Sequence, residues 1–155
     1  MNASWRVVWL SIGGALGVNA RYWLAVAIDR LAGTRFPWAT LAINVSGAFV
    51  LGLLATMMSR LGAHHPARLF ALVGFLGGYT TFSTFALESH KLAESGATGR
   101  SLVYMVGSVA AGLLAVTLGV MLGRSLGHRG GADPQRPPRA AAGGGTGAAE
   151  LAELD

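Results

Sequence analysis

Four long stretches of the sequence carry almost no charge, and this feature constrains the fold more than any other. Residues 7–28 contain one charged side chain, Arg21, and residues 36–59, 69–87 and 101–123 contain none. A helix needs about 20 consecutive apolar residues to cross the hydrocarbon of a bilayer. The sequence therefore predicts an all-α membrane protein with four transmembrane helices, joined by the short linkers 29–35, 60–68 and 91–100.

Composition also favours lipid over water as the solvent. Of the 155 residues, 52% are hydrophobic and 12% are charged, and the mean hydropathy is +0.50, whereas soluble domains carry about 25% charged residues. The absence of cysteine excludes disulfides and thiolate metal sites. Residues 7–20 could be a signal-peptide core, but Arg21 would then precede the cleavage site and three further spans follow. We expect a multi-pass protein of the inner (plasma) membrane.

The end of the chain differs from the rest in composition. Residues 127–147 are rich in Gly, Pro, Ala and Arg and cannot bury a core. We therefore expect a four-helix transmembrane channel domain over residues 4–126 and a disordered tail over residues 127–155.

Basic residues flank the predicted spans almost evenly on the two sides of the membrane, although an excess of Lys and Arg on one side normally sets orientation. The protein is either oriented by remote charges of its tail or inserted in both orientations, and we favour the second, which permits an antiparallel homodimer. Four short spans enclose little space, so an oligomer is expected. The N-terminal side has Arg6, Arg60, Arg68, Arg124 and Arg129, and the other side has Arg30, Arg35, Lys91 and Arg100.

Small residues recur every four positions on two of the predicted helices. The first has Gly13 and Gly17, and such spacing permits close approach of two helices. We interpret both stripes as packing faces. The fourth span has Gly107, Ala111, Ala115, Gly119 and Gly123.

The third stretch is unusually rich in glycine and hydroxyl groups at its middle. Adjacent glycines weaken a helix, and non-helical backbone at membrane depth is tolerated only where protein or a water-filled cavity covers it. One interpretation is a kinked helix whose hydroxyls bond to its own carbonyls. We favour a third helix broken mid-membrane, where freed carbonyls suit a small cation and helix N-termini suit anions. The run contains Gly77, Gly78, Tyr79, Thr80, Thr81, Ser83 and Thr84.

Two polar side chains fall inside the first two spans, where each needs a partner or a task. Arg21 is either an interfacial anchor or a positive charge beside an anion vestibule. Asn44, one turn after Thr40, is either a bond between helices or an anion ligand, because its amide offers two N–H donors.

Aromatic and hydroxyl groups on the last two spans form further candidates. Phe82 and Phe85 share a helix face; they either pack in a core or present electropositive ring edges to a small anion. Tyr104 and Ser108 form a second polar track at a four-residue spacing, and Glu88 at the end of span three could bond to either track.

Three motifs carry a family resemblance. Residues 13–17 read Gly-Gly-Ala-Leu-Gly and are followed by Arg21 and Tyr22. Residues 40–44 read Thr-Leu-Ala-Ile-Asn, and residues 77–85 read Gly-Gly-Tyr-Thr-Thr-Phe-Ser-Thr-Phe and are followed by Glu88. Over residues 4–126 the chain resembles the Fluc/CrcB family of fluoride ion channels. It departs from that family at Val18 and Asn19, which replace the small residue usual after the third glycine of the opening motif. It also departs at Gly112, one turn after Ser108, where members often carry a second serine.

The resemblance implies a dual-topology antiparallel homodimer that lets cytoplasmic fluoride leave the cell passively, which lowers intracellular fluoride and its toxicity. It also implies a structural Na⁺ at the dimer interface, bound by backbone carbonyls of Gly77 and Thr80 from both protomers, and Arg21 near a vestibule. The fluoride pathway would be lined or flanked by Asn44, Phe82, Phe85, Thr40, Ser83, Thr84, Glu88, Tyr104 and Ser108.

Three rival functions fit the sequence less well. A small dual-topology multidrug exporter needs an acidic residue within its first helix, but the first span has none before Asp29. An enzyme is not indicated, because no catalytic constellation, metal-ligand spacing or phosphate loop occurs, and His64 and His65 lie in a linker. A structural subunit that conducts nothing leaves the polar third helix unexplained. No basic helix face indicates a nucleic-acid partner.

Overall fold

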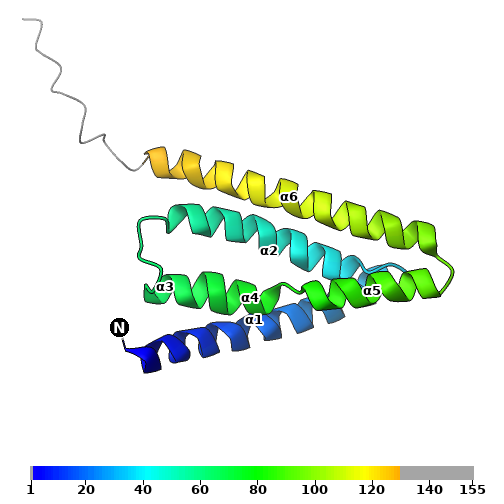
Figure 1. Cartoon of the computed structure of the whole chain (residues 1–155), viewed down its shortest axis with the longest axis horizontal. Helices are drawn as coiled ribbons and strands as arrows, with labels where there is room; N and C mark the ends of the chain where they lie inside the picture. Colours follow the sequence, from blue (N-terminus) through cyan, green and yellow to red (C-terminus); the bar gives the residue numbers. More distant parts are fainter. Residues whose placement is uncertain (1, 130–155) are drawn as a thin grey trace, which may run out of the picture.

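The computed structural model describes residues 2–129, and all regular structure in this range is helical (Figure 1). Three long helices are α1 (Ala3–Ala32), α2 (Trp38–Met57) and α6 (Thr98–Arg129). The path between α2 and α6 consists of α3 (Pro66–Arg68), the π-helix η1 (Leu69–Phe75), α4 (Leu76–Tyr79) and α5 (Phe82–Glu94).

Three helical segments in this part of the chain are long and apolar enough to cross a membrane, namely Trp38–Met57, Pro66–Glu94 and Thr98–Gly127. Their length and composition are those of an α-helical membrane protein. The first predicted span lies within α1 but is not among the three, because Asn19 and Arg21 lower its mean hydropathy.

Helix α6 continues to Arg129, three residues past the end of the predicted channel domain at residue 126. A single glycine, Gly127, costs only about 1 kcal/mol in a helix and does not stop a helix of 32 residues. The rest of the expected tail, residues 130–155, lies outside the described residues.

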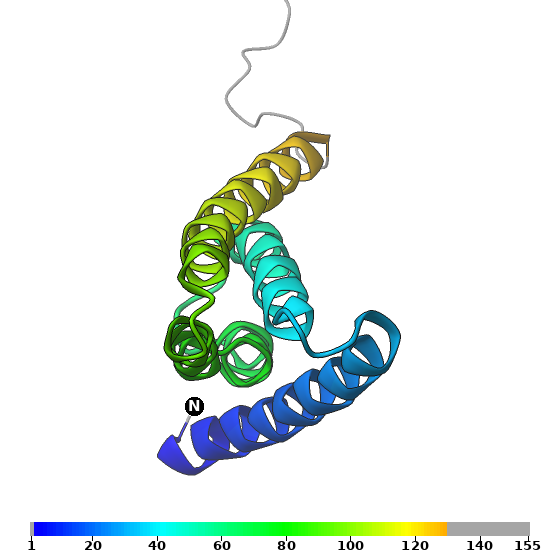
Figure 2. The same ribbon diagram turned by 90° about the vertical axis from the view of Figure 1, so that its right-hand side faces the viewer.

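The long helices lie side by side with their connections at two ends of the molecule (Figure 1). One end holds the N-terminus, the α2–α3 loop and the end of α6, and the other holds the α1–α2 and α5–α6 loops. Helix α2 packs chiefly on α6, and α1 packs on η1 and α4. Figure 2 shows α1 crossing obliquely at the edge of this arrangement.

Glycines make these contacts close. A Cβ atom at Gly17 would overlap the carbonyl group of Phe75, and one at Gly119 would overlap the carbonyl oxygen of Phe49. The small residues of α6 contact the rest of the chain only toward the C-terminal end of the helix. A Cβ added at Gly119 or Gly123 would meet α2, whereas one added at Gly107 has no atom of the described chain within 4 Å.

Candidate functional site

The helical path from Pro66 to Glu94 is interrupted at Thr80 and Thr81, whose backbones are extended. Thr81 is the N-cap of α5, since its Oγ1 accepts a hydrogen bond from the N–H of Thr84 at 3.3 Å. Ser and Thr are favoured N-cap residues for this reason. Local capping chemistry therefore begins a new helix at Phe82.

The adjacent glycines, Gly77 and Gly78, lie inside α4 and are separated from the break by Tyr79. Gly78 faces α1, and a Cβ there would lie 2.8 Å from the carbonyl oxygen of Gly14. Its role in the structure is close helix contact. The interruption itself coincides with the two threonines that follow.

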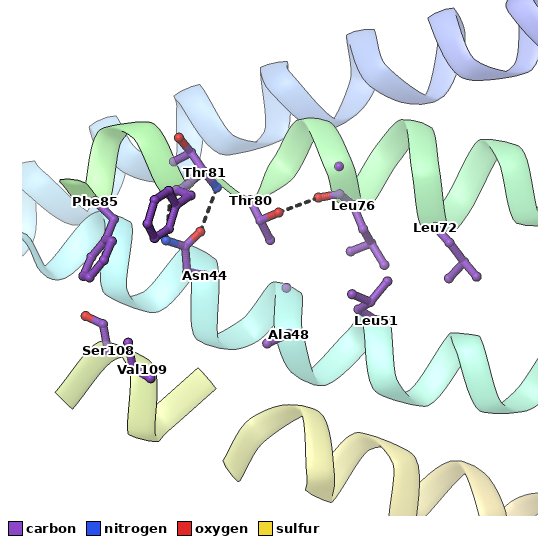
Figure 3. A pocket seen from close by; sticks show the side chains of 13 residues that line it. Asn44, Ala48, Leu51, Leu72, Leu76, Thr80, Thr81, Phe85, Ser108 and Val109 are labelled. Carbon is purple, nitrogen blue, oxygen red and sulfur yellow. Dashed lines mark hydrogen bonds between the residues drawn. The ribbon is translucent and has the colours of Figure 1, made fainter. Parts of the chain in front are cut away.

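Asn44 of α2 bridges to the broken backbone with two hydrogen bonds (Figure 3). Its Nδ2 donates to the carbonyl oxygen of Thr81 at 2.9 Å, and its Oδ1 accepts from the N–H of Thr81 at 2.8 Å. The side chain is thus a bond between helices, as one of the two interpretations of the sequence had it. One of its two amide N–H groups is used in this way, which leaves the second N–H for another acceptor.

The break releases backbone carbonyls from their usual partners, among them those of Gly77 and Thr80. In an unbroken helix the N–H of Thr81 would bond to Gly77 and the N–H of Thr84 to Thr80. Here these two N–H groups donate to Asn44 and to Thr81 Oγ1. Carbonyl oxygens suit hard cations. The described residues contain no cluster of three acidic or histidine side chains that could hold a metal ion, so a metal at this position would depend on backbone oxygens.

A cavity of about 380 Å³ opens beside the break, between α2, the helical path from Pro66 to Glu94, and α6 (Figure 3). No charged side chain lines it, and Ser108 contributes a buried hydroxyl oxygen that has no hydrogen-bond partner among the described residues. Such an unsatisfied group is costly and is a candidate ligand for a guest. The lining comprises Asn44, Gly47, Ala48, Leu51, Leu72, Leu76, Gly77, Thr80, Thr81, Phe82, Phe85, Ser108 and Val109.

Two phenylalanines form one wall of this cavity. The ring centroids of Phe82 and Phe85 are 5.6 Å apart at an interplanar angle of 47°, and Phe85 lies 5.2 Å from the ring of Tyr104. Phe82 is 78% exposed in the single chain, so the cavity is open on its side.

Glu88 joins the predicted polar residues of three helices. Its Oε1 accepts from Thr40 Oγ1 at 2.9 Å, and its Oε2 accepts from the hydroxyl of Tyr104 at 2.7 Å. Thr40 and Tyr104 are buried, at 5% and 1% exposure. Ser83, by contrast, is exposed and contacts only Thr81 Oγ1 among these hydroxyls, at 3.3 Å.

Arg21 lies in a second cavity, of about 280 Å³, between α1 and the break. Hydroxyl residues line this cavity together with Arg21. One of them, Thr81, also lines the first cavity. The cavity is lined by Val18, Arg21, Tyr22, Ala25, Thr40, Ile43, Thr81 and Thr84.

Thr81 is a site residue that was not predicted individually from the sequence, although it bonds to both Asn44 and Thr84. The available signal was a threonine directly before the apolar start of a helix, because threonine is a favoured N-cap residue. A third cavity, of about 240 Å³ near the α1–α2 loop, was also missed because its charged residues come from distant segments: Asp29, Arg35, Glu88 and Lys91.

Comparison with known proteins defines the class to which this fold and site belong. Residues 8–120 match the family described as CrcB-like protein, Camphor Resistance (CrcB). The chain belongs to this family.

Its relatives carry a more particular name. The chain is 45% identical over 122 residues to the "Fluoride-specific ion channel FluC" of Agrobacterium fabrum, covering 78% of this chain and 98% of the relative. The chain is 44% identical to the protein of the same name from Acidobacterium capsulatum, which covers 78% of this chain and 98% of the relative. It is also 44% identical to that of Chloroflexus aurantiacus, which covers 79% of this chain and 98% of the relative.

Proposed function

We propose that this protein is a fluoride channel that lets cytoplasmic fluoride leave the cell passively and so limits its toxicity. The observation that carries the proposal is family membership, with relatives named fluoride-specific channels that match over 98% of their own length. The cavity beside the break is compatible, since its polar groups are amide and hydroxyl donors and no fixed cation lines it to trap the ion.

Fluoride is small and strongly hydrated, so a pore must replace its water with donors. Asn44 has one N–H beyond the bond to Thr81, Ser108 has an unpartnered hydroxyl, and the ring edges of Phe82 and Phe85 carry partial positive charge. Each of these donors is neutral and weak. Conduction requires such sites, which bind strongly enough to admit an ion and weakly enough to release it.

The remaining predicted residues extend this route toward the loop end of the molecule. Thr40, Glu88 and Tyr104 form one hydrogen-bonded unit, and Phe85 contacts the Tyr104 ring, so the unit adjoins the phenylalanine wall. Ser83 and Thr84 flank it at the start of α5. On the α1 side, the positive charge of Arg21 would attract anions into its vestibule.

We further propose that α1 is a fourth transmembrane helix of the plasma membrane and that the active unit is a dual-topology antiparallel homodimer. Arg21 is half-buried against a cavity and not wholly exposed to lipid, which lowers its cost within a span. The strong exposure of Phe82 and the open side of the cavity favour coverage by a second copy. The nearly even distribution of basic residues favours insertion both ways.

A structural Na⁺ at the interface of this dimer is consistent with the break. The carbonyls of Gly77 and Thr80, released from helical bonding, would hold it from both protomers. When bound, the ion would supply positive charge near the pathway and offset the dipoles of these carbonyls.

Release of fluoride from proteoliposomes tests the proposal. Vesicles loaded with fluoride should lose it rapidly through the purified protein, whereas chloride-loaded vesicles should retain their anion. Asn44→Asp, which introduces a negative charge, and Phe82→Ile, which removes a ring edge, should slow the release.

Absence of fluoride release from vesicles shown to contain folded protein would refute the proposal. An assay of proton-coupled export of organic cations then addresses the multidrug exporter. Nothing in α1 favours that function, because Asp29, its one acidic residue, lies in the last turn of the helix.

A further inference from the structure

The cavity near the α1–α2 loop places two acidic and two basic side chains around one opening. Asp29 and Glu88 are half-buried in its wall, whereas Arg35 and Lys91 are exposed. Neither basic side chain has an ion-pair partner within 4.0 Å in the described part of the chain. The four charges therefore share one cavity without being locked into pairs.

This cavity adjoins the interior hydrogen-bonded unit. Glu88 lines the cavity and also accepts the bonds from Thr40 and Tyr104. Phe36, another lining residue, places its ring edge-on to Tyr104 with centroids 5.5 Å apart. Glu88 is thus shared by this cavity and the interior hydrogen-bonded unit.

An anion that uses this opening meets a difficulty, because the carboxylates of Asp29 and Glu88 repel it. We propose that Arg35 and Lys91 act as counter-charges that cancel this repulsion and admit the anion at this end of the pathway. The inference rests on the proposed fluoride conduction and assigns a role to two residues outside the family motifs. In this role they are rim residues that set the local ion concentration and do not form a binding site.

The size of the effect follows from Coulomb's law. A unit charge roughly 7 Å from a monovalent ion in water changes the local concentration of that ion about two- to threefold at low salt. Two charges together give about five- to eightfold. The Debye length is about 30 Å at 0.01 M ionic strength and about 3 Å at 1 M, so the effect should vanish in concentrated salt.

Fluoride release from proteoliposomes at about 0.01 M and about 1 M ionic strength, set with impermeant salts, tests the inference. Arg35→Gln combined with Lys91→Gln should lower the initial rate about five- to eightfold at low salt and less than about twofold at high salt. Arg35→Lys should keep the wild-type rate. Asp29→Asn should change the low-salt rate in the opposite direction, raising it about two- to threefold.

Arg100→Gln is the matched control, because it removes a positive charge at the same end of the molecule but outside the cavity. It should alter the rate less than about 1.5-fold. A double variant that matches this control, a loss that persists at about 1 M salt, or a slower Asp29→Asn would each overturn the counter-charge role while the wild type still conducts. A wild type that releases no fluoride would instead overturn the proposed function, and the inference with it.

Discussion

Replacement of Asn44 by alanine should destabilise the protein strongly, because it removes both hydrogen bonds between α2 and the break. These are the bonds of 2.9 Å and 2.8 Å to the backbone of Thr81. A buried backbone group left without a partner costs about 1–3 kcal/mol, and side-chain bonds within membranes average closer to about 0.6 kcal/mol. For two such groups we expect Asn44→Ala to lower the free energy of unfolding by about 2–4 kcal/mol.

The measurement is a denaturing-detergent titration of protein in mild detergent micelles, followed by the fluorescence of the four tryptophans. Ser46→Ala is the matched control on the same helix. Ser46 is exposed and bonds to Tyr79 and to a carbonyl of its own helix, so its loss should cost no more than about 1 kcal/mol. If Asn44→Ala unfolds within about 0.5 kcal/mol of the wild type, the bridge does not stabilise the break and the reasoning is refuted.

Three further substitutions test individual contacts by the same titration. Gly17→Ala should lower the free energy of unfolding by about 1–3 kcal/mol, because the added Cβ overlaps the backbone of η1. Gly112→Ala, where the added Cβ has open space around it, should be nearly neutral. Equal losses in the two variants would argue against tight packing of α1. Tyr104→Phe should cost about 1–3 kcal/mol by removing the 2.7 Å bond to the Glu88 carboxylate, and no loss would show that water replaces the hydroxyl. Arg68→Ala should cost about 1–2 kcal/mol, because its guanidinium donates to two carbonyls at and beyond the end of α2; an unchanged midpoint would contradict this capping.

Helix positions follow closely from the uncharged stretches of the sequence, because burial in lipid and charge exclude each other over about 20 residues. All four stretches fall on helical segments of the structure. Apolar character is graded, however, and α1 carries Asn19 and Arg21 in the middle of its length. Whether α1 can cross the membrane depends on whether other parts of the protein cover these two side chains. The local sequence pattern does not contain that information.

The break illustrates a different limit. The glycine pair drew attention to the right part of the third helix, but Gly78 serves contact with α1, and the extended residues are Thr80 and Thr81. The partner of the Thr81 backbone, Asn44, lies 37 residues earlier in the chain. Composition and spacing identify Asn44 as costly within a membrane, but only the packing of α2 on the break selects its partner. The same holds for the cavity near the α1–α2 loop, whose four charged residues come from α1, the α1–α2 loop and α5.

Sodium and Asn44 should be thermodynamically coupled, because both depend on the same peptide group. While the Thr81 N–H is bonded to Asn44, the Gly77 carbonyl is released and available to the proposed Na⁺. In Asn44→Ala nothing holds the Thr81 backbone in its place, so the Gly77 carbonyl is no longer fixed in position for the ion. An ion that binds only the folded form raises its stability by about 1.4 kcal/mol for each tenfold rise in concentration above the dissociation constant. We therefore expect the unfolding free energy of the wild type to fall when Na⁺ is exchanged for a large organic cation at constant ionic strength, and that of Asn44→Ala to change little. Equal sodium dependence in the two proteins would mean that the carbonyls freed by the break are not the site of the cation.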